Sequence, residues 1–303
     1  MDGIINIDKP VGISSFGVVQ RLKRLTGQKK IGHVGTLDPL AGGVLPLFLG
    51  KMTKLVPLFN REDKTYDVTV RLGAFSSTQD EEGEKTEVPL TPECNAKRIS
   101  EVLKEFEGEI EQLPPMLSAV RFKGRRLYSY AREGVEVERQ VRSVTIHAIR
   151  DVQFHPPRLR FSVCCSKGTY IRVLAEDLGK RLGTGAYLAC LTRTKCGKFF
   201  TLDKAVKLDQ IEKLDKIEIE RLFVDPKSLL PDWHVVNVAG DCERDVGNGR
   251  QVRISAKSVL ISQKNRNSVR ALAVNWNNRL IAIGNLEFSQ DSQYRFQPSK
   301  VLV

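Results

Sequence analysis

The first hydrophobic pattern along the chain predicts a basic amphipathic helix near the N-terminus. Apolar side chains recur at helical spacing over residues 18–25, and basic side chains occupy the opposite face. Ser14 and Ser15 precede this run as candidate N-caps, and Gly27 follows it as a stop signal.

Further patterns predict alternating strands and helices as far as about residue 230. Strands are expected at 66–72, 143–154 and 158–165, a hairpin with its turn at 123–124, and helices over 91–108 and 171–182. Thr91 is the expected N-cap of the first of these helices, and Gly108 is its expected stop. Tyr170 and Arg172 then lie at the junction between a predicted strand and the helix that follows it.

The segment from Gly32 to Gly50 is rich in glycine and contains two prolines. No regular element accommodates this composition throughout, so we expect a structured loop that leads into a short strand. A single carboxylate, Asp38, lies in this segment, and His33 precedes it by five residues. Functional residues concentrate on loops that a rigid scaffold holds in place. The spacing matches neither a phosphate-binding loop nor a dinucleotide-binding fingerprint.

The last 70 or so residues have a different pattern. Prolines near residues 225–232 mark a boundary, after which short alternating runs are separated by Asn-Gly and Asn-Asn pairs. This pattern predicts a small all-β module over 232–303, after a larger domain over 1–231.

Composition excludes several classes of protein. With 303 residues, 41% hydrophobic and 28% charged, the chain is typical of a globular protein of about two domains. It contains no apolar run of about 20 residues and no signal-peptide pattern at its start, so we expect a cytoplasmic protein without a membrane contact. The six cysteines include no C-x-x-C pair, which argues against a zinc finger.

The charge distribution suggests a polyanionic partner. The formal net charge is +12, yet residues 61–112 carry seven basic and fourteen acidic side chains, so the positive charge lies elsewhere. Such an uneven distribution is typical of a protein with one nucleic-acid-binding face. A merely basic, well-solvated surface is the alternative.

Each candidate for chemistry also has an ordinary structural interpretation. Asp38 precedes a proline, as turn-forming aspartates often do, and an isolated His33 is typical of a protein surface. Tyr66 and Tyr170 fit a packed core, and Arg172 fits a solvated position at a helix start. Composition and spacing leave these alternatives open.

Five blocks of sequence, taken together, resemble one family. They are DKPVGISS (8–15), IGHVGTLDPLAGGVLPLFLG (31–50), DKTYDVTVRLG (63–73), LPPMLSAVRFKGRRLYSYAREG (113–134) and CSKGTYIRVLAEDLG (165–179). In this order they resemble the TruB-type tRNA pseudouridine synthases. NGRQV at 248–252 is similar, more loosely, to the PUA modules that such enzymes carry. The stretch SSTQD at 76–80 departs from the acidic, threonine-rich run of the family, so no site residue is assigned there.

The resemblance implies an α+β protein with the pseudouridine-synthase catalytic fold, in which helices flank a mixed, mainly antiparallel central sheet. A PUA-like RNA-binding domain would follow it. The implied reaction converts the T-loop uridine at tRNA position 55 into pseudouridine without a cofactor or metal. Asp38 would be the catalytic carboxylate, Arg172 its partner, and Tyr66 the residue stacked on the uracil and a candidate for proton transfer.

Further roles follow from the same resemblance. His33 would enter the T-loop when the target base flips out, Tyr170 and Leu191 would line the uracil pocket, and Lys9 would support it. The RNA backbone would contact basic residues, namely Arg21, Lys23, Arg24, Lys29, Lys30, Arg121, Lys123, Arg125 and Arg126. The partners would be the T-loop stem-loop and the acceptor stem of tRNA, and we expect a monomer.

Two other hypotheses fit parts of the pattern. An RNA-binding protein on the same scaffold could have lost catalysis, but it would then have no need of Asp38, Tyr66 and Arg172, which are all present. A nucleotide-dependent enzyme would require a phosphate-cradling glycine spacing that the chain lacks.

Overall fold

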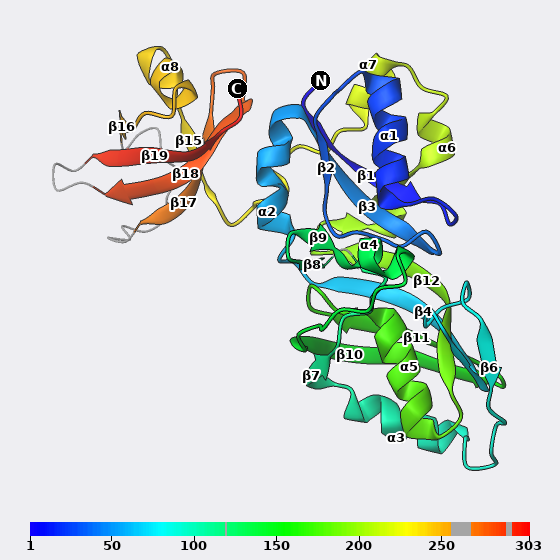
Figure 1. Ribbon diagram of the computed structural model, residues 1–303. Helices are drawn as coiled ribbons and strands as arrows, with labels where there is room; N and C mark the ends of the chain where they lie inside the picture. The colour runs from blue at the N-terminus through cyan, green and yellow to red at the C-terminus, as the bar shows by residue number, and fades with distance from the viewer. Residues whose placement is uncertain (119, 256–267, 289–292) are drawn as a thin grey trace.

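The computed structural model describes residues 1–118, 120–255, 268–288 and 293–303 (Figure 1). The strands are β1 (Gly3–Lys9), β2 (Ile31–His33), β3 (Ala41–Leu49), β4 (Lys64–Leu72), β5 (Ala74–Ser76), β6 (Lys85–Glu87), β7 (Gly108–Gln112), β8 (Arg121–Phe122), β9 (Arg125–Arg126), β10 (Arg142–His155), β11 (Arg158–Cys165), β12 (Ala186–Cys196), β13 (Phe200–Thr201), β14 (Val206–Lys207), β15 (His234–Asn237), β16 (Val252–Ile254), β17 (Val269–Val274), β18 (Leu280–Phe288) and β19 (Tyr294–Val301). The helices are α1 (Ser15–Thr26), α2 (Val56–Phe59), α3 (Ala96–Glu105), α4 (Leu127–Arg132), α5 (Ile171–Leu182), α6 (Leu208–Ile211), α7 (Lys216–Arg221) and α8 (Asp241–Gly247), with short 3-10 helices at Gly50–Leu55 and Leu202–Lys204.

A ten-stranded sheet forms the centre of the larger part of the molecule. Its order is β14-β1-β3-β12-β4-β11-β10-β7, with β13 paired to β12 and β2 to β3. The pairs β1–β14 and β12–β3 are parallel and the others are antiparallel, which confirms the expected mixed, mainly antiparallel sheet. Helices α3 and α5 pack on the half of the sheet around β4 and β11, and α1 packs near β1 (Figure 1).

The predicted N-terminal helix is confirmed as α1. The Ser14 hydroxyl accepts the backbone N–H of Gly17 at 3.0 Å, and Gly27 takes the left-handed conformation that ends the helix. The expected N-cap of α3 was wrong: Asn95, not Thr91, accepts the first free N–H, from Arg98 at 3.1 Å. Thr91 instead begins a turn, since its carbonyl accepts the N–H of Cys94.

The glycine-rich segment is more regular than its composition predicts. Instead of a loop leading to a short strand, it contains β2 and the nine-residue strand β3, every residue of which is buried. A strand buried on both faces shows no apolar–polar alternation, so the sequence contained no alternating pattern from which β3 could be predicted. Gly43 is needed there because a Cβ would lie 2.3 Å from the carbonyl oxygen of Arg193, and its φ is +94°.

The C-terminal residues form a separate five-stranded sheet with the order β15-β17-β18-β19-β16. The expected β-structure is present, but the region also contains helix α8, which the sequence pattern did not predict. The pair Asn248-Gly249 ends that helix instead of joining two strands. A shared cluster of buried apolar side chains connects this sheet, through residues such as Leu272 and Ile283, to Phe48 and Met52.

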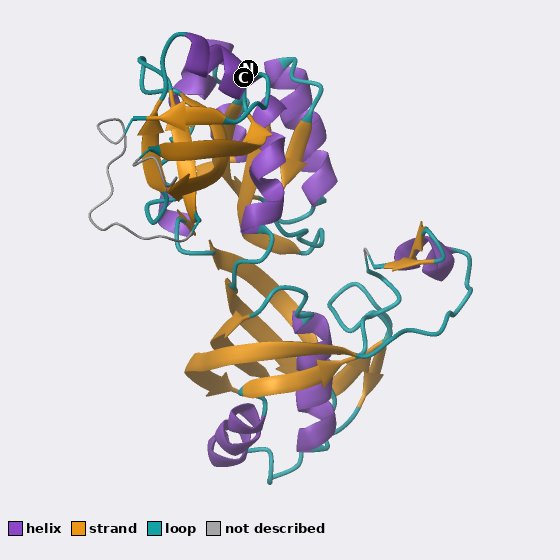
Figure 2. Ribbon diagram, turned by 90° about the vertical axis from the view of Figure 1, so that its left-hand side faces the viewer, coloured by secondary structure: helices purple, strands orange, loops and turns teal. Residues whose placement is uncertain are grey.

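The predicted hairpin is confirmed only near its turn, as the two-residue strands β8 and β9, with Lys123 and Gly124 in the left-handed region. The residues that follow form α4 instead of a longer second strand. Together with α4 the hairpin extends away from the central sheet (Figure 2). No helix within the described ranges is both long and apolar enough to cross a membrane.

Candidate active site

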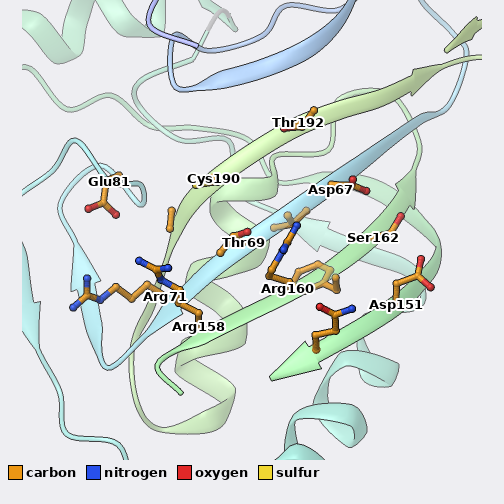
Figure 3. A pocket seen from close by; sticks show the side chains of 14 residues that line it. Asp67, Thr69, Arg71, Glu81, Asp151, Arg158, Arg160, Ser162, Cys190 and Thr192 are labelled. Atoms are coloured by element: carbon orange, nitrogen blue, oxygen red, sulfur yellow. The ribbon is translucent and has the colours of Figure 1, made fainter. Parts of the chain in front are cut away.

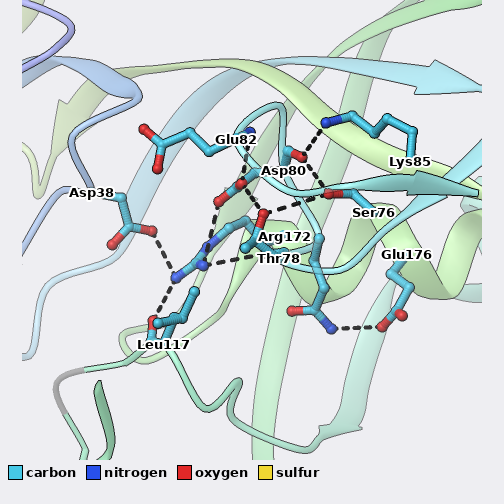
Figure 4. Close-up of polar contacts among 10 residues, drawn as sticks. Asp38, Ser76, Thr78, Asp80, Glu82, Lys85, Leu117, Arg172 and Glu176 are labelled. Atoms are coloured by element: carbon cyan, nitrogen blue, oxygen red, sulfur yellow. Dashed lines mark hydrogen bonds and ion pairs between the residues drawn. The ribbon is translucent and has the colours of Figure 1, made fainter. Parts of the chain in front are cut away.

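Asp38 and Arg172 meet beside the middle strands β12 and β4 of the central sheet, as the resemblance implied. Arg172 Nη2 lies 3.0 Å from Asp38 Oδ2, and the same nitrogen donates to the carbonyl of Leu117 at 2.8 Å (Figure 4). The Arg172 side chain is 6% exposed, whereas that of Asp38 is 41% exposed. A buried cation therefore holds a carboxylate that solvent or a substrate can still reach.

Two neighbouring segments fix the turn that carries Asp38. The Ser15 hydroxyl, at the start of α1, accepts the N–H of Leu37 at 2.8 Å, and the carbonyl of Pro39 accepts the N–H of Gly12 at 2.8 Å. Asp38 also forms a turn, as its position before a proline suggested, because its carbonyl accepts the N–H of Ala41. Both interpretations of this residue therefore apply, since the backbone forms the turn while the side chain is free to bind Arg172.

Asp80 is a member of the site that sequence reasoning missed. Its Oδ2 lies 3.4 Å from Arg172 Nη1, and its side chain is only 4% exposed. It belongs to the stretch 76–80 in which we assigned no site residue. Nothing in the linear sequence connects Asp80 with an arginine 92 positions later; only the fold brings the two together.

Burial raises the pKa of Asp38 above its ordinary value, and the nearby carboxylate of Asp80 acts in the same direction. The charges of Arg172 and Lys9 oppose this rise, Arg172 more strongly. The side chain is thus a partly exposed carboxylate whose ionised form is stabilised by neighbouring cations. This environment is typical of carboxylates with a chemical role.

A cavity of about 260 Å³ opens beside Asp38 and is lined by most of the residues predicted for catalysis or substrate binding. Asp38, Tyr66, Tyr170, Arg172 and Leu191 all line it. Sequence reasoning missed other lining residues, among them Asn60, Lys64, Ser118, Ser166, Thr169 and Arg193.

Tyr170 is positioned through its backbone. The Gln112 side chain, at the end of β7, accepts the N–H of Tyr170 at 2.9 Å and donates to its carbonyl at 3.2 Å. Tyr170 is the N-cap residue of α5, two positions before Arg172. This amide clamp therefore fixes the strand-to-helix junction that orients both side chains.

Lys9 and His33 lie near this cavity but do not line it. The buried ammonium of Lys9 donates to the carbonyls of Pro10 and Ile13 at 2.9 and 2.6 Å, so it supports the backbone beside Asp38. Burial lowers the pKa of Lys9 to about 8. Burial also lowers the pKa of His33, whose Nδ1 is buried with no hydrogen-bond partner among the residues described.

The predicted RNA-contacting residues form two groups on the surface, one on and after α1 and one on the β8–β9 hairpin. Arg24, Lys29, Lys30, Arg121, Lys123, Arg125 and Arg126 are exposed, and Arg21 and Lys23 are partly exposed. Two of them form ion pairs within the protein: Arg21 pairs with Glu212 at 3.0 Å, and Arg125 with Glu133 at 2.6 Å.

A second groove, of about 760 Å³, lies on the outer face of β4, β11 and β12 (Figure 3). Its walls carry Arg71, Arg158 and Arg160 as well as Asp67 and Glu81, so opposite charges are mixed. None of the residues predicted for catalysis or substrate binding lines it. Across the described part of the chain, no group of three His, Cys, Asp or Glu side chains is arranged to hold a metal ion.

Comparison with known proteins identifies the family. A model of the TruB family pseudouridylate synthase N-terminal domain matches residues 23–171, and one of the tRNA pseudouridylate synthase B C-terminal domain matches 172–225. The tRNA pseudouridine synthase B of Nitrosococcus oceani is 43% identical over 255 residues, covering 83% of this chain and 82% of that protein. The chain belongs to the TruB family. The tRNA pseudouridine synthase B of Clostridium acetobutylicum is 38% identical, over 94% of this chain and 96% of that protein.

The TruB assignment agrees with the fold of a solved structure. A chain in the crystal structure of a Cbf5–Nop10–Gar1 complex has a TM-score of 0.67 and 24% identity, covering 99% of this chain and 85% of that chain. The fold class expected from the resemblance is therefore confirmed. Both TruB family models end by residue 225, so the PUA resemblance of residues 232–303 stays a prediction.

Proposed function

We propose that this protein isomerises the T-loop uridine at position 55 of tRNA to pseudouridine. The observation that carries the proposal is the Asp38–Arg172 ion pair at a cavity lined by Tyr66, Tyr170 and Leu191. The names of its TruB relatives specify tRNA and pseudouridine synthesis. A cavity of about 260 Å³ suits one nucleobase and not a duplex, so the target nucleotide must leave the folded loop to react.

Asp38 is the group that acts on the sugar. In the reaction the N1–C1′ bond breaks, the uracil turns within the pocket, and C5 joins C1′. The C5 proton is lost to solvent and N1 becomes protonated, so no water need be activated. The Asp38 carboxylate either attacks C1′ or promotes loss of the uracil through a glycal, and its pairing with Arg172 keeps it ionised and oriented.

The apolar and aromatic groups retain the detached base. Tyr66, paired with Arg193 across β4 and β12, would stack on the uracil, and its phenol is the candidate for moving a proton near the sugar or base. Leu191, two residues before Arg193 on the same face of β12, would form an apolar wall. Tyr170 would close the pocket at the start of α5.

The surrounding surface would bind the folded RNA. The exposed basic residues of α1 and the β8–β9 hairpin supply phosphate contacts, and His33 would fill the space that the flipped base leaves. We infer a catalytic domain over residues 1–231 and a PUA-like domain over 232–303, the latter lying along the acceptor stem. The protein would act as a monomer in the cytoplasm.

Release of label from C5 of uridine tests this function directly. An unmodified T-loop stem-loop RNA, tritiated at C5 of its uridines, is incubated with the protein in the absence of added metal or cofactor. We expect the parent protein to release one equivalent per stem-loop, and Asp38→Asn to release none over the same time while still binding the RNA. Asparagine keeps the size of the side chain but removes the carboxylate that the chemistry requires.

Asp67→Asn is the matched control. Asp67 is next to Tyr66 on β4 but is exposed on the opposite face, in the groove of Figure 3, so this variant should release label at the parent rate. Binding without release by the parent protein would point to an RNA-binding protein without catalysis. Equal activity of Asp38→Asn and the parent would refute the assigned role of the carboxylate.

A further inference from the structure

Arg193 is a buried arginine to which no role has yet been assigned. It lies on β12, in register with Tyr66 on β4 and with Gly43 on β3, and its exposure is 0%. Directly opposed residues of neighbouring strands project to the same face of a sheet. The guanidinium is therefore held beside Tyr66, and both residues line the cavity next to Asp38.

The guanidinium binds the backbone on both sides of the turn that carries Asp38. Nη2 donates to the carbonyl of Gly35 at 3.0 Å and to that of Val34 at 3.3 Å, while Nε donates to the carbonyl of Val44 at 2.7 Å. One side chain thus closes the base of the loop between residues 35 and 44. Because Arg193 belongs to β12, which pairs with β4, its side chain also ties this loop to the strand next to β4.

The third nitrogen, Nη1, is buried without a hydrogen-bond partner among the described residues. An unmatched buried N–H is costly, so a nearby acceptor has a strong tendency to orient toward it. Burial raises the pKa of the Tyr66 phenol to about 12, and the positive charge of this guanidinium opposes that rise. Gly35 leaves the necessary space, because a Cβ at that position would lie 2.7 Å from Nη1.

We propose that Arg193 is a positioning residue for the isomerisation, which fixes the phenol oxygen of Tyr66 and the base of the Asp38 loop relative to each other. It acts through these two groups without touching the substrate. The inference rests on the proposed function, because the two positions matter together only if both groups face one reacting nucleotide.

A double-mutant cycle on the full-length protein tests the inference. Arg193→Lys, Tyr66→Phe and the double variant are compared for single-turnover C5 label release and for binding of the stem-loop. We expect Arg193→Lys to lower the release rate about 10- to 100-fold with nearly unchanged binding, and to add little in the Tyr66→Phe background. Arg160→Lys, on the exposed outer face of β11, is the matched control and should release label at the parent rate.

The outcomes separate the inference from the function on which it rests. An inactive parent protein would overturn both, whereas an active parent with equal effects of Arg193→Lys in the two Tyr66 backgrounds would overturn the positioning role alone. If Arg193→Lys does not fold, Gly35→Ala replaces it, because its Cβ would displace Nη1. If the release rate of Tyr66→Phe is too slow to compare, 3-fluorotyrosine is placed at position 66 instead. Its fluorine resonance should shift in the Arg193 or Gly35 variant and stay unchanged in Arg160→Lys. An unchanged resonance in the Arg193 or Gly35 variant would overturn the positioning role.

Discussion

At the scale of single residues, Arg172 forms ion pairs with two carboxylates that have different surroundings. Asp80 is almost fully buried and also accepts the backbone N–H of Glu82, whereas Asp38 faces the cavity. The ion pair with Asp80 therefore holds the arginine, and the arginine in turn presents Asp38 to the substrate. A guanidinium is suited to this task because its planar fork offers several donors in fixed directions.

Replacing Asp80 by asparagine should impair the reaction more than RNA binding. The change removes the buried charge that fixes Arg172, so Arg172 and Asp38 lose their alignment. We expect the single-turnover rate to fall about 10- to 100-fold, while the dissociation constant for the stem-loop changes by less than about threefold. Glu82→Gln, two residues away and exposed, should behave as the parent. A loss confined to binding would show that Asp80 shapes the RNA surface instead.

At the scale of elements, alternation and helical spacing correctly predicted β4, β11, α1 and α5, because each buries apolar side chains at the predicted spacing. Strand β10 was predicted as well, although it buries only Val144 and Ile146. The same signals failed for β3, which is buried on both faces. The resemblance supplied Asp38 and Arg172, which meet as it implied. Asp80 and Arg193 were missed because their partners are distant in sequence and only the fold brings them together.

A substitution at Gly43 tests how much the close approach of β3 and β12 contributes to stability. In Gly43→Ala the new Cβ would lie 2.3 Å from the Arg193 carbonyl oxygen, between two central strands, in addition to the strain of a φ of +94°. We expect a loss of about 2–4 kcal/mol in the free energy of unfolding, measured in urea. Gly12→Ala has a similar φ of +92° but nothing within 4 Å, so it isolates the strain and should cost only about 1 kcal/mol. Equal losses would mean that the close strand approach is not limiting.

At the scale of the whole molecule, the sheet separates two environments. Near the cavity beside Asp38, Arg126 of the β8–β9 hairpin is close enough to His33 for its positive charge to lower the pKa of the imidazole, whereas the groove on the outer face mixes arginines with carboxylates. The acid-rich stretch 61–112 ends in α3 and β7, and α3 lies at the far end of the molecule from α1 (Figures 1 and 2). A polyanion would therefore be drawn toward α1 and the hairpin and away from the acidic end.

The salt dependence of RNA binding should report this polarity. Removing two charges from the hairpin, in Arg121→Gln/Lys123→Gln, should reduce the slope of log affinity against log salt concentration by about 1.5, because each phosphate contact contributes about 0.7–0.9. Arg158→Gln/Arg160→Gln removes the same charge from the outer groove and should leave the slope unchanged, although the net charge falls equally. Equal changes in both pairs would mean that net charge, and not the hairpin, governs binding. A change confined to the hairpin pair would establish that the hairpin contacts the RNA backbone.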